Sequence, residues 1–355
     1  MQLTTTYPDR NYPIVIAHHV LDQLGDYIKD YKTVFLFVDD HIYCLWSERI
    51  QSIAKQWDIQ VYPLPAGEEM KTLEHYNQVI ESLLAHQITR KTCILAMGGG
   101  ATGDFSGFIA STLLRGVDYI QIPTTLLAHD SSIGGKVAIN SSHGKNLIGA
   151  FYRPSAVLYD LDFLQTLPYS EILSGYAEVY KHALLDSAQV VQDVENAYPN
   201  QQALAEMQDI DKYLYHGVET KLKFVIADER ESGVRQYLNL GHTFGHAVEY
   251  RYHLPHGHAV AIGLLYQFIM SNLIYDAKFD IKHYVRYFQQ LAYPLQHIKD
   301  FEFEALYQLM LVDKKNNDQG VQMVLLKAVG QPTTHHVTKA ELEQAFAELQ
   351  QVTKE

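Results

Sequence analysis

Cysteine is nearly absent from this sequence of 355 residues, which contains only Cys44 and Cys93. Two cysteines in apolar stretches cannot form a disulfide framework or a thiolate metal site, and they suit a reducing cytosol. Basic residues are also in deficit, because 28 Lys and Arg against 41 Asp and Glu give a formal charge of −13. This charge argues against nucleic acid or an anionic membrane as a partner.

Targeting signals and long apolar runs are the other absences. The first residues, MQLTTTYPDRNYP, lack the charged and apolar blocks of a signal peptide. We expect no apolar run to approach the roughly 18 residues that span a bilayer. Hydrophobic content of 47% and charged content of 19% describe an ordinary soluble globular protein. We therefore predict a cytoplasmic protein, and its length suits two domains.

The first half of the chain alternates strand-like and helix-like segments. Helical patterns, as at residues 70–86 and 102–114, lie between several short runs rich in β-branched or aromatic residues. This order predicts a mainly parallel, Rossmann-like sheet that is covered by helices on both faces. The predicted strands are residues 12–17, 33–38, 59–64, 92–97, 119–123 and 156–160.

Strand signals nearly stop after Leu167, and helical spacing replaces them. Residues 211–227 carry apolar side chains at helical spacing, and further helices are expected from near Ala259, Ile281 and Phe303. We place the boundary at Pro168. The prediction is an α/β domain of residues 1–168 followed by a mostly α-helical domain of residues 169–355.

The sharpest motif of the first domain is AMGGGATGDFSGF, in which a strand runs into three glycines and then into a helix. Such a turn lets the backbone approach a pyrophosphate, to which the helix N-terminus offers free N–H groups. Gly98, Gly100 and Gly103 satisfy G-x-G-x-x-G, a match that is weak alone. Because ligands bind at the carboxyl ends of parallel strands, Asp39 is the candidate for a ribose-binding acid. We predict dinucleotide binding, and the alternative is a tight structural turn.

Residues 123–154 are dense in glycine and serine, and they predict a loop that folds over a ligand. Hydroxyl and ammonium groups in such a loop suit phosphate and ribose oxygens. The alternative is a solvated loop with incidental lysines. The polar groups concerned are Thr124, Thr125, Asp130, Lys136, Lys145 and Asn146.

Four histidines within an apolar helical pattern indicate a metal site. Two of them are four residues apart and so share a helix face, and the others follow about ten residues later. A second kind of ligand, a carboxylate, comes from a helix expected over residues 174–185, where Glu178 lies three residues before Lys181. A surface ion pair is the alternative for this carboxylate. The histidines are His242, His246, His256 and His258.

Together these motifs resemble those of the 3-dehydroquinate synthase family, within the sugar-phosphate cyclases. The resemblance covers nearly the whole chain, through AGEEMK, GGGATGD, TTLLAHDSSIGGK, GKN, SGYAEVYKH, LNLGHTFGHA and DKKN. It implies an enzyme that uses NAD and Zn²⁺, with Co²⁺ as a substitute, on a small-molecule sugar phosphate. It also implies a homodimer and an active site in the cleft between the two domains.

The resemblance assigns roles to individual residues. It implies Glu178, His242 and His256 as zinc ligands. It implies NAD contacts by Asp39, Glu68, Lys71, Gly99, Gly100, Ala101, Thr102, Gly103, Asp104, Thr124, Thr125, Lys136, Lys145, Phe163, Leu164, Gln165 and Thr166. It implies substrate or catalytic contacts by Arg115, Asp130, Lys136, Asn146, Lys181, Lys221, Arg235, Asn239, His246, Lys314 and Lys315.

Two positions depart from the family pattern. Ala101 stands where the family usually has a branched aliphatic residue, a change that we expect to be tolerated. His258 stands where the family usually has glutamate after His-Gly, so it offers zinc a rival imidazole. The choice of His256 over His258 therefore rests on the alignment of the motif.

The implied reaction converts 3-deoxy-D-arabino-heptulosonate 7-phosphate to 3-dehydroquinate and phosphate, a step of the shikimate pathway. NAD⁺ would oxidise the C5 hydroxyl while zinc polarises that oxygen, and phosphate would leave by β-elimination. The hydride would then return, the ring would open, and an intramolecular aldol step would close the carbocycle.

Three other functions remain open. A cyclase that acts on a different sugar phosphate would share the NAD and zinc sites. A metal-dependent polyol dehydrogenase would need no anion pocket. The sequence has cationic residues that suit such a pocket, which argues against a dehydrogenase: Lys136, Lys181, Lys221 and Arg235. A nucleotide-sensing binding protein would leave Glu178 and the histidines unexplained.

Overall fold

The computed structural model describes residues 1–86, 88–312 and 320–354. They form two compact units, Met1–Pro168 and Tyr169–Glu355. The first contains a mostly parallel sheet with helices, and the second is mostly helical. The predicted fold class, an α/β region followed by a helical region, is confirmed.

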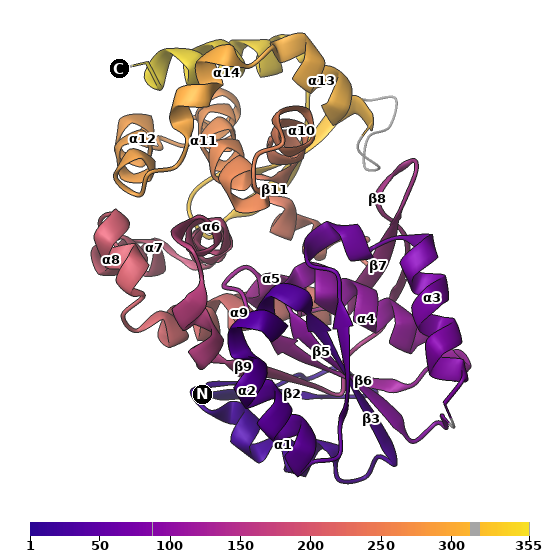
Figure 1. Ribbon diagram of the computed structural model, residues 1–355. Coiled ribbons are helices and arrows are strands. Elements are labelled where there is room, and N and C mark those ends of the chain that lie inside the picture. Colours follow the sequence, from indigo (N-terminus) through magenta and orange to yellow (C-terminus); the bar gives the residue numbers. More distant parts are fainter. Residues whose placement is uncertain (87, 313–319, 355) are drawn as a thin grey trace. The chain divides into compact units, whose positions relative to one another are not determined.

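A seven-stranded sheet lies at the centre of the first unit (Figure 1). Its order is β1-β2-β9-β6-β5-β3-β4, in which β1 and β2 pair antiparallel and the other neighbours pair parallel. The strands are β1 (Gln2–Thr4), β2 (Pro13–Ala17), β3 (Thr33–Asp39), β4 (Gln60–Leu64), β5 (Thr92–Gly98), β6 (Asp118–Pro123) and β9 (Ala156–Asp160).

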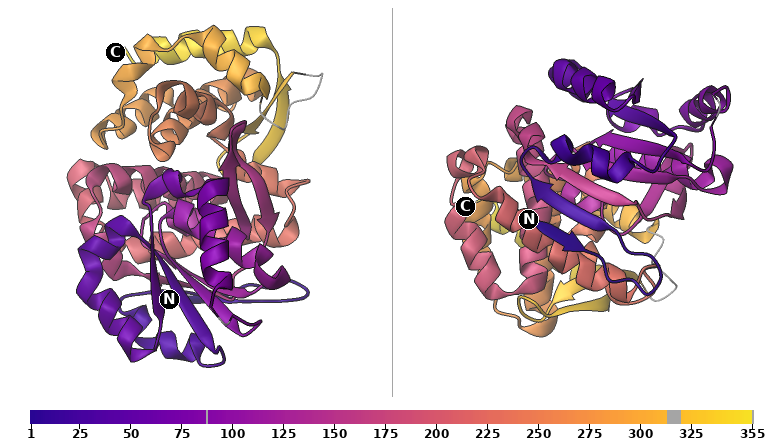
Figure 2. Two further views of the ribbon diagram at one scale, coloured as in Figure 1. Left: turned by 45° about the vertical axis from the view of Figure 1, so that its right-hand side comes forward. Right: turned by 90° about the horizontal axis from the view of Figure 1, so that it is seen from below.

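Two layers of helices cover the faces of this sheet (Figure 2). Residues of α1 and α2 pack on one face together with Leu36 of β3, whereas residues of α3 and α4 pack on the other together with Phe37. Successive side chains of a strand point to opposite faces, so both faces must be apolar. The helices are η1 (Val20–Gln23), α1 (Leu24–Ile28), α2 (Asp40–Gln56), η2 (Gly67–Met70), α3 (Leu73–Leu84), α4 (Gly100–Thr112), η3 (Leu113–Arg115), α5 (Ala128–Ser131) and η4 (Leu161–Thr166).

The expected loop over residues 123–154 is in large part a hairpin. Strands β7 (Lys136–Ser141) and β8 (Gly144–Phe151) pair antiparallel, from Lys136 opposite Phe151 to Ser141 opposite Gly144. Val137 and Ile139 of β7 are buried and pack with the residues of α4. The prediction of a loop was therefore wrong for residues 136–141 and 144–151, because the glycines and lysines obscured a strand with buried residues.

The sheet has a topological switch point between β3 and β5. After β3 the chain passes through α2 to the edge strand β4, whereas after β5 it passes through α4 to β6 on the other side. Val38 pairs with Met97, so Asp39 and Gly98 end neighbouring strands side by side. Open α/β sheets bind ligands outside the carboxyl ends of their strands at such a point. The glycine turn therefore lies where this fold places a ligand.

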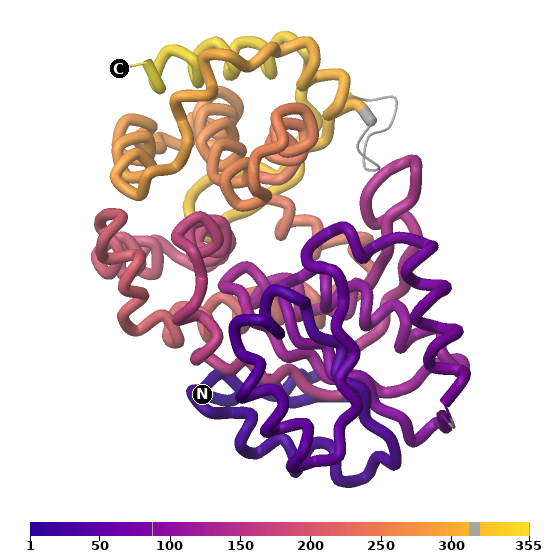
Figure 3. Tube along the Cα trace, viewed as in Figure 1, coloured from indigo at the N-terminus to yellow at the C-terminus, as the bar shows by residue number. Residues whose placement is uncertain are grey.

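A long buried helix, α11 (His256–Tyr275), is the centre of the second unit (Figure 3). Helices α6, α10, α12 and α14 pack against it. The other elements are α6 (Tyr169–Asp186), α7 (Ala188–Ala197), α8 (Gln201–Glu206), α9 (Ile210–Ala227), η5 (Val234–Asn239), α10 (His242–Tyr252), α12 (Ile281–Gln290), η6 (Leu295–Asp300), α13 (Phe303–Val312), β10 (Val321–Leu326), β11 (Pro332–Val337) and α14 (Lys339–Val352).

Strands also occur late in the chain, where strand signals had nearly stopped. Strand β10 pairs antiparallel with β11, with Val321 opposite Val337. Its sequence, VQMVLL, is a short apolar run of the kind that periodicity alone cannot assign to helix or strand.

The expectation about apolar runs also needs a correction. Helix α11 is long and apolar enough to cross a membrane by length and composition, so one run does approach the required length. However, 83% of its most apolar window is buried inside the structure. The helix is apolar all round because other elements of the second unit surround it, as is typical of a core helix.

Candidate functional site

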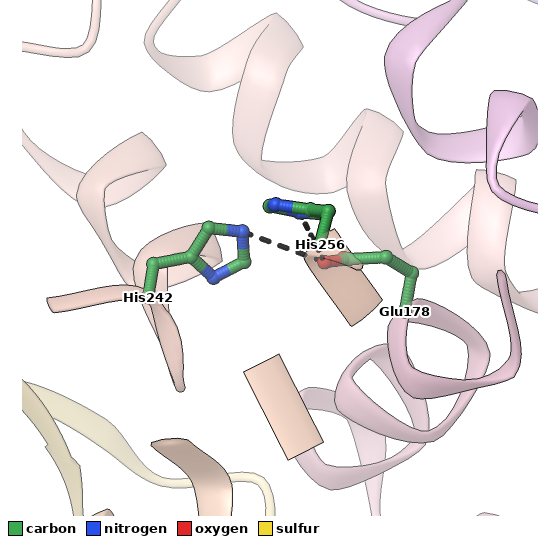
Figure 4. Close-up of side chains that lie close together, drawn as sticks. All are labelled: Glu178, His242 and His256. Atoms are coloured by element: carbon green, nitrogen blue, oxygen red, sulfur yellow. Dashed lines mark ion pairs between the residues drawn. The ribbon is translucent and has the colours of Figure 1, made fainter. Parts of the chain in front are cut away.

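Three side chains of the second unit point toward one another (Figure 4). Glu178 comes from α6, His242 is the first residue of α10, and His256 is the first residue of α11. The Nε2 atoms of His242 and His256 lie 3.4 and 3.6 Å from Oε1 of Glu178, whose side chain is 1% exposed. These three residues form one of the groups of described residues that could hold a metal ion.

The separations within this group fit a tetrahedral ion better than they fit hydrogen bonds. An N–H···O hydrogen bond spans roughly 2.7–3.2 Å between heavy atoms. Two ligand atoms that each lie about 2.0–2.1 Å from one tetrahedral ion are roughly 3.4 Å apart. One carboxylate and two imidazoles would also leave a coordination position open, as catalytic zinc sites do.

Close contact between α11 and α6 places His256 beside Glu178. The backbone N–H of Gly257 donates to Oγ of Ser174 at 3.0 Å. A Cβ atom at Gly257 would lie 1.8 Å from the carbonyl oxygen of Ser174, so any other residue would push the two helices apart. The His-Gly pair is therefore a structural requirement as well as a chemical one.

Both candidate histidine ligands use Nδ1 in hydrogen bonds. Nδ1 of His242 donates to the carbonyl oxygen of Leu240 at 2.9 Å, and Nδ1 of His256 donates to Oε2 of Glu249 at 2.8 Å. A neutral imidazole that carries its proton on Nδ1 has its lone pair on Nε2, the atom that faces Glu178. The two rings are thus oriented for coordination through Nε2.

The two histidines titrate differently because their neighbours differ. Burial, and then the positive charge of Lys181, lower the pKa of His242 well below its usual value. Burial also lowers the pKa of His256, but the carboxylates of Glu178 and Glu249 beside its ring outweigh this effect and raise the pKa to about 9. Metal binding at His256 must therefore displace a proton.

Buried cations gather on elements near the candidate metal ligands. Lys181 pairs with Oε2 of Glu178, the oxygen that does not face the histidines. Lys221 on α9 and Arg235 on η5 are, like Lys181, at most 6% exposed, and α6, α9 and η5 pack against one another. Lysine and arginine are rarely buried unless they are paired. Asn239, at the end of η5, donates to Oε1 of Glu231 at 2.7 Å.

The remaining two histidines of the cluster lie in different surroundings. His246 is exposed, with its ring centroid 5.1 Å from that of His242 and 5.8 Å from that of His256. His258 turns its Nε2 toward the carbonyl oxygen of Ser170 at 3.3 Å, and it belongs to none of the described residue groups that could hold a metal ion. The structure therefore brings His256, and not His258, to Glu178.

In the first unit, the buried Lys71 joins several residues expected to bind NAD or substrate. Its Nζ donates to Oδ2 of Asp104 at 2.8 Å and to Oδ1 of Asn146 at 2.5 Å. Glu68, three residues earlier, accepts a hydrogen bond from Asn140 at 2.8 Å. These contacts tie the AGEEMK segment and the β7–β8 hairpin to helix α4.

The glycine turn presents backbone atoms at the carboxyl end of β5. Gly99 is the N-cap of α4 and has no side chain to cap the helix, so N–H groups of the first turn remain available to a ligand. Asp39, the expected ribose acid, caps α2 through the N–H groups of His41 and Ile42, and it also accepts from Gly67 at 3.3 Å. Thr124 is buried and its N–H donates to Gly98 at 3.0 Å.

Some expected residues lie apart from this turn or outside the described residues. Arg115 is exposed beyond the other end of α4, roughly 20 Å along the helix at 1.5 Å per residue. Phe163 and Leu164 are buried in the core, whereas Gln165 and Thr166 are exposed. Lys314 and Lys315, with the DKKN motif, lie outside the described residues. The other exposed candidates are Glu68, Lys136, Lys145, Asn146 and His246.

Comparison with known proteins identifies the family. The family models described as 3-dehydroquinate synthase N-terminal and C-terminal match residues 61–174 and 175–316. The 3-dehydroquinate synthase of Staphylococcus saprophyticus subsp. saprophyticus is 61% identical over 346 residues, which cover 98% of each chain. That of Staphylococcus epidermidis is 54% identical over 354 residues, which cover all of each chain.

The chain belongs to the 3-dehydroquinate synthase family.

The predicted resemblance to 3-dehydroquinate synthases is thereby confirmed, and solved structures show how widely the fold is shared. A 2-deoxy-scyllo-inosose synthase complexed with carbaglucose-6-phosphate, NAD⁺ and Co²⁺ has a TM-score of 0.86 at 24% identity and covers 98% of this chain and 100% of its own. A 2-epi-5-epi-valiolone synthase from Streptomyces hygroscopicus, with NAD⁺ and Zn²⁺ bound, has a TM-score of 0.86 at 24% identity and covers 98% and 99%. An iron-containing alcohol dehydrogenase from Thermococcus thioreducens has a TM-score of 0.70 at 14% identity and covers 96% and 98%.

Glu249 contacts this centre and was not among the residues predicted from the sequence. It lies seven residues after His242 and three after His246, so it shares their face of α10. That spacing was a usable signal for a carboxylate near the histidines.

Proposed function

We propose that this chain is a 3-dehydroquinate synthase that requires NAD and a divalent metal ion, Zn²⁺ or its substitute Co²⁺. The observation that carries the proposal is the convergence of Glu178, His242 and His256 in a chain that is 61% identical to a named 3-dehydroquinate synthase. The substrate would be 3-deoxy-D-arabino-heptulosonate 7-phosphate. The products would be 3-dehydroquinate and phosphate.

The residues of the second unit fit a metal ion and an anionic substrate. Glu178 would bind the metal through Oε1, while Lys181 neutralises Oε2 and keeps the carboxylate in place. Lys221 and Arg235 would meet phosphate or carboxylate oxygens, because buried cations gain most from charge-assisted hydrogen bonds. His246, exposed beside the ligands, would contact the substrate or pass a proton.

The residues of the first unit fit a dinucleotide. Backbone N–H groups at the glycine turn would hold the pyrophosphate, and the positive end of the α4 dipole would favour its charge. Lys71 would keep Asp104 and Asn146 in place rather than meet the ligand with a free charge. Asp130, Lys136 and Asn146 would supply the substrate contacts of this unit.

When bound, NAD and the metal would supply reversible hydride transfer and polarisation of the substrate oxygen. The chain would contribute binding, orientation and exclusion of water. Because the hydride is returned in each cycle, no net oxidation would occur. We also expect a cytoplasmic protein that forms a homodimer. Light scattering on the purified protein would test the oligomeric state.

A test of this proposal uses the substrate with NAD at a tenth of its concentration. We expect complete conversion to 3-dehydroquinate by NMR, release of an equal amount of phosphate, and no accumulation of NADH absorbance. NADH that rises with substrate loss would instead indicate the polyol dehydrogenase. Conversion of another sugar phosphate, with none of this one, would indicate a different cyclase.

A further inference from the structure

His256 is held by a carboxylate on the side of the ring away from Glu178. Its Nδ1 lies 2.8 Å from Oε2 of Glu249, and its Nε2 lies 3.6 Å from Oε1 of Glu178. Glu249 comes from α10, which packs against α11, where His256 is the first residue. The side chain of Glu249 is half-buried, at 18% exposure, so water screens its charge only in part.

His242 provides a comparison within the same centre. Its Nδ1 donates to a backbone carbonyl, which is neutral and fixed by the start of α10. The Nδ1 of His256 donates to a carboxylate, which carries a full charge and stands on a side chain. A carboxylate partner raises the basicity of the opposite nitrogen and fixes the ring tautomer.

We propose that Glu249 is a positioning residue for the metal centre, which orients His256 and makes its Nε2 a stronger ligand. This inference rests on the proposed function, because it requires that a metal ion binds to Glu178, His242 and His256. Glu249 would act through His256, whose Nδ1 it contacts, and not as a ligand of the ion. The sequence offers Glu249 for this role because it shares a face of α10 with His242 and His246.

The rival arrangement makes Glu249 itself a metal ligand. His246, Glu249 and His256 form another group of described residues that could hold a metal ion. Three observations oppose it. The distance of 2.8 Å is that of a hydrogen bond and is shorter than the roughly 3.4 Å between two ligands of a tetrahedral ion. His246 is exposed, and the nitrogen that faces Glu249 is not the one that faces Glu178.

The experiment compares Glu249→Gln and Glu249→Ala in the full-length protein, titrated with Zn²⁺ against a competing chelator. We expect the dissociation constant to rise roughly 10- to 100-fold in Glu249→Ala, the range found for partners of ligating histidines. The dissociation constant of Glu249→Gln should lie between those of Glu249→Ala and the unchanged protein, because an amide oxygen still accepts from Nδ1 but lacks the charge. The matched control is Glu302→Gln, which removes a nearby carboxylate that is 71% exposed and pairs with Arg251 instead of a histidine.

Two further readouts separate positioning from a general structural role. The melting temperature of the metal-free protein should be unchanged in Glu249→Gln, while the increase on adding Zn²⁺ should be smaller. The visible spectrum of the Co²⁺ form should keep the intensity of a four-coordinate site, since no ligand is lost. Unchanged Zn²⁺ affinity in both variants, or a lost Co²⁺ ligand, would overturn the proposal.

Failure of the proposed function would look different. If the unchanged protein binds no metal, the centre itself is refuted and Glu249 loses its role with it. If the unchanged protein binds metal and turns over substrate, while Glu249→Ala binds metal equally well, the centre stands and the positioning role is refuted.

Discussion

At the glycine turn of the first unit, the atoms available to a ligand are backbone N–H groups, whereas in the second unit they belong to the side chains of Glu178, His242 and His256. The first arrangement depends on the absence of side chains, since any Cβ at the turn comes between the backbone and the ligand. The second depends on the identity of each side chain and on its orientation by a neighbour. Ligand binding at the glycine turn should therefore be weakened by adding a side chain, whereas metal binding should be weakened by removing one.

The largest expected effect is the loss of a metal ligand. Glu178→Gln or His256→Ala should weaken Zn²⁺ binding by more than about 100-fold, beyond the range for an orienting residue, and should abolish turnover. NAD affinity should change far less, by about twofold or less, because none of the three metal ligands is among the residues expected to bind NAD. Elemental analysis, calorimetry with NAD and the turnover assay measure these quantities, and prolonged dialysis against a chelator should reproduce the loss.

His258→Ala is the control for this prediction. Its ring turns toward Ser170, so the metal content should remain that of the unchanged protein. If His258→Ala loses the metal while His256→Ala keeps it, the ligand assignment is wrong.

Residue spacing could specify that one of these two histidines is a ligand but not which one, and the choice of His256 came from the resemblance to the family. Residues two apart on a helix point about 200° apart, so His256 and His258 cannot both face Glu178. The choice depends on the contact of Gly257 with Ser174, a residue 83 positions earlier in the chain. Such a contact between distant segments leaves no trace in local spacing.

The burial of each strand explains why β5 was predicted and β8 was not. Strand β5 is buried at every residue and reads as an uninterrupted apolar run, so it was predicted within one residue. Strand β8 is exposed or half-buried throughout, because it packs on β7 at the edge of the unit, and its glycines and lysine resemble a loop. Burial on both faces made β5 visible in the sequence, and exposure hid β8.

A smaller effect is expected when a methyl group is added at the glycine turn. A Cβ at Gly99 would lie 3.4 Å from Cγ2 of Thr125, an ordinary contact, so Gly99→Ala should fold with a nearly unchanged melting temperature. We expect its NAD dissociation constant to rise roughly tenfold, or about 1.4 kcal/mol, because the methyl group keeps the pyrophosphate from the backbone. Calorimetry with NAD and thermal unfolding without it measure the two effects.

Gly107→Ala, two turns further along α4, separates ligand approach from helix packing. A Cβ there would lie 2.4 Å from Cγ1 of Val137 and 3.1 Å from the ring of Tyr119. Such overpacking costs roughly 1–3 kcal/mol, so this variant should lose stability while the folded protein keeps its NAD affinity. If Gly99→Ala instead lost stability and kept its affinity, the turn would be a structural feature and not a ligand site.

The smallest expected effect concerns the amino end of the same sheet, where the fold places no ligand. Asp118, the first residue of β6, accepts from Arg10 at 2.7 Å and from Tyr31 at 2.9 Å. Burial raises the pKa of this carboxyl group, but the hydrogen bonds from Arg10 and Tyr31 outweigh it and hold the pKa below its usual value. A depressed pKa in the folded state stabilises the protein above the unfolded pKa of about 3.9, and this stabilisation is lost as the pH falls through the folded value.

Asp118→Asn should therefore lower the free energy of unfolding by at most about 1 kcal/mol at pH 7, since the pair is partly exposed. Urea unfolding should give the same difference at pH 7 and pH 5, and the two proteins should converge below about pH 3.9. NAD affinity should not change, because ligands bind at the opposite ends of the strands. A weaker NAD affinity in Asp118→Asn would show that the two ends of the sheet are not independent, and the contrast between a ligand-binding end and a purely stabilising end would fail.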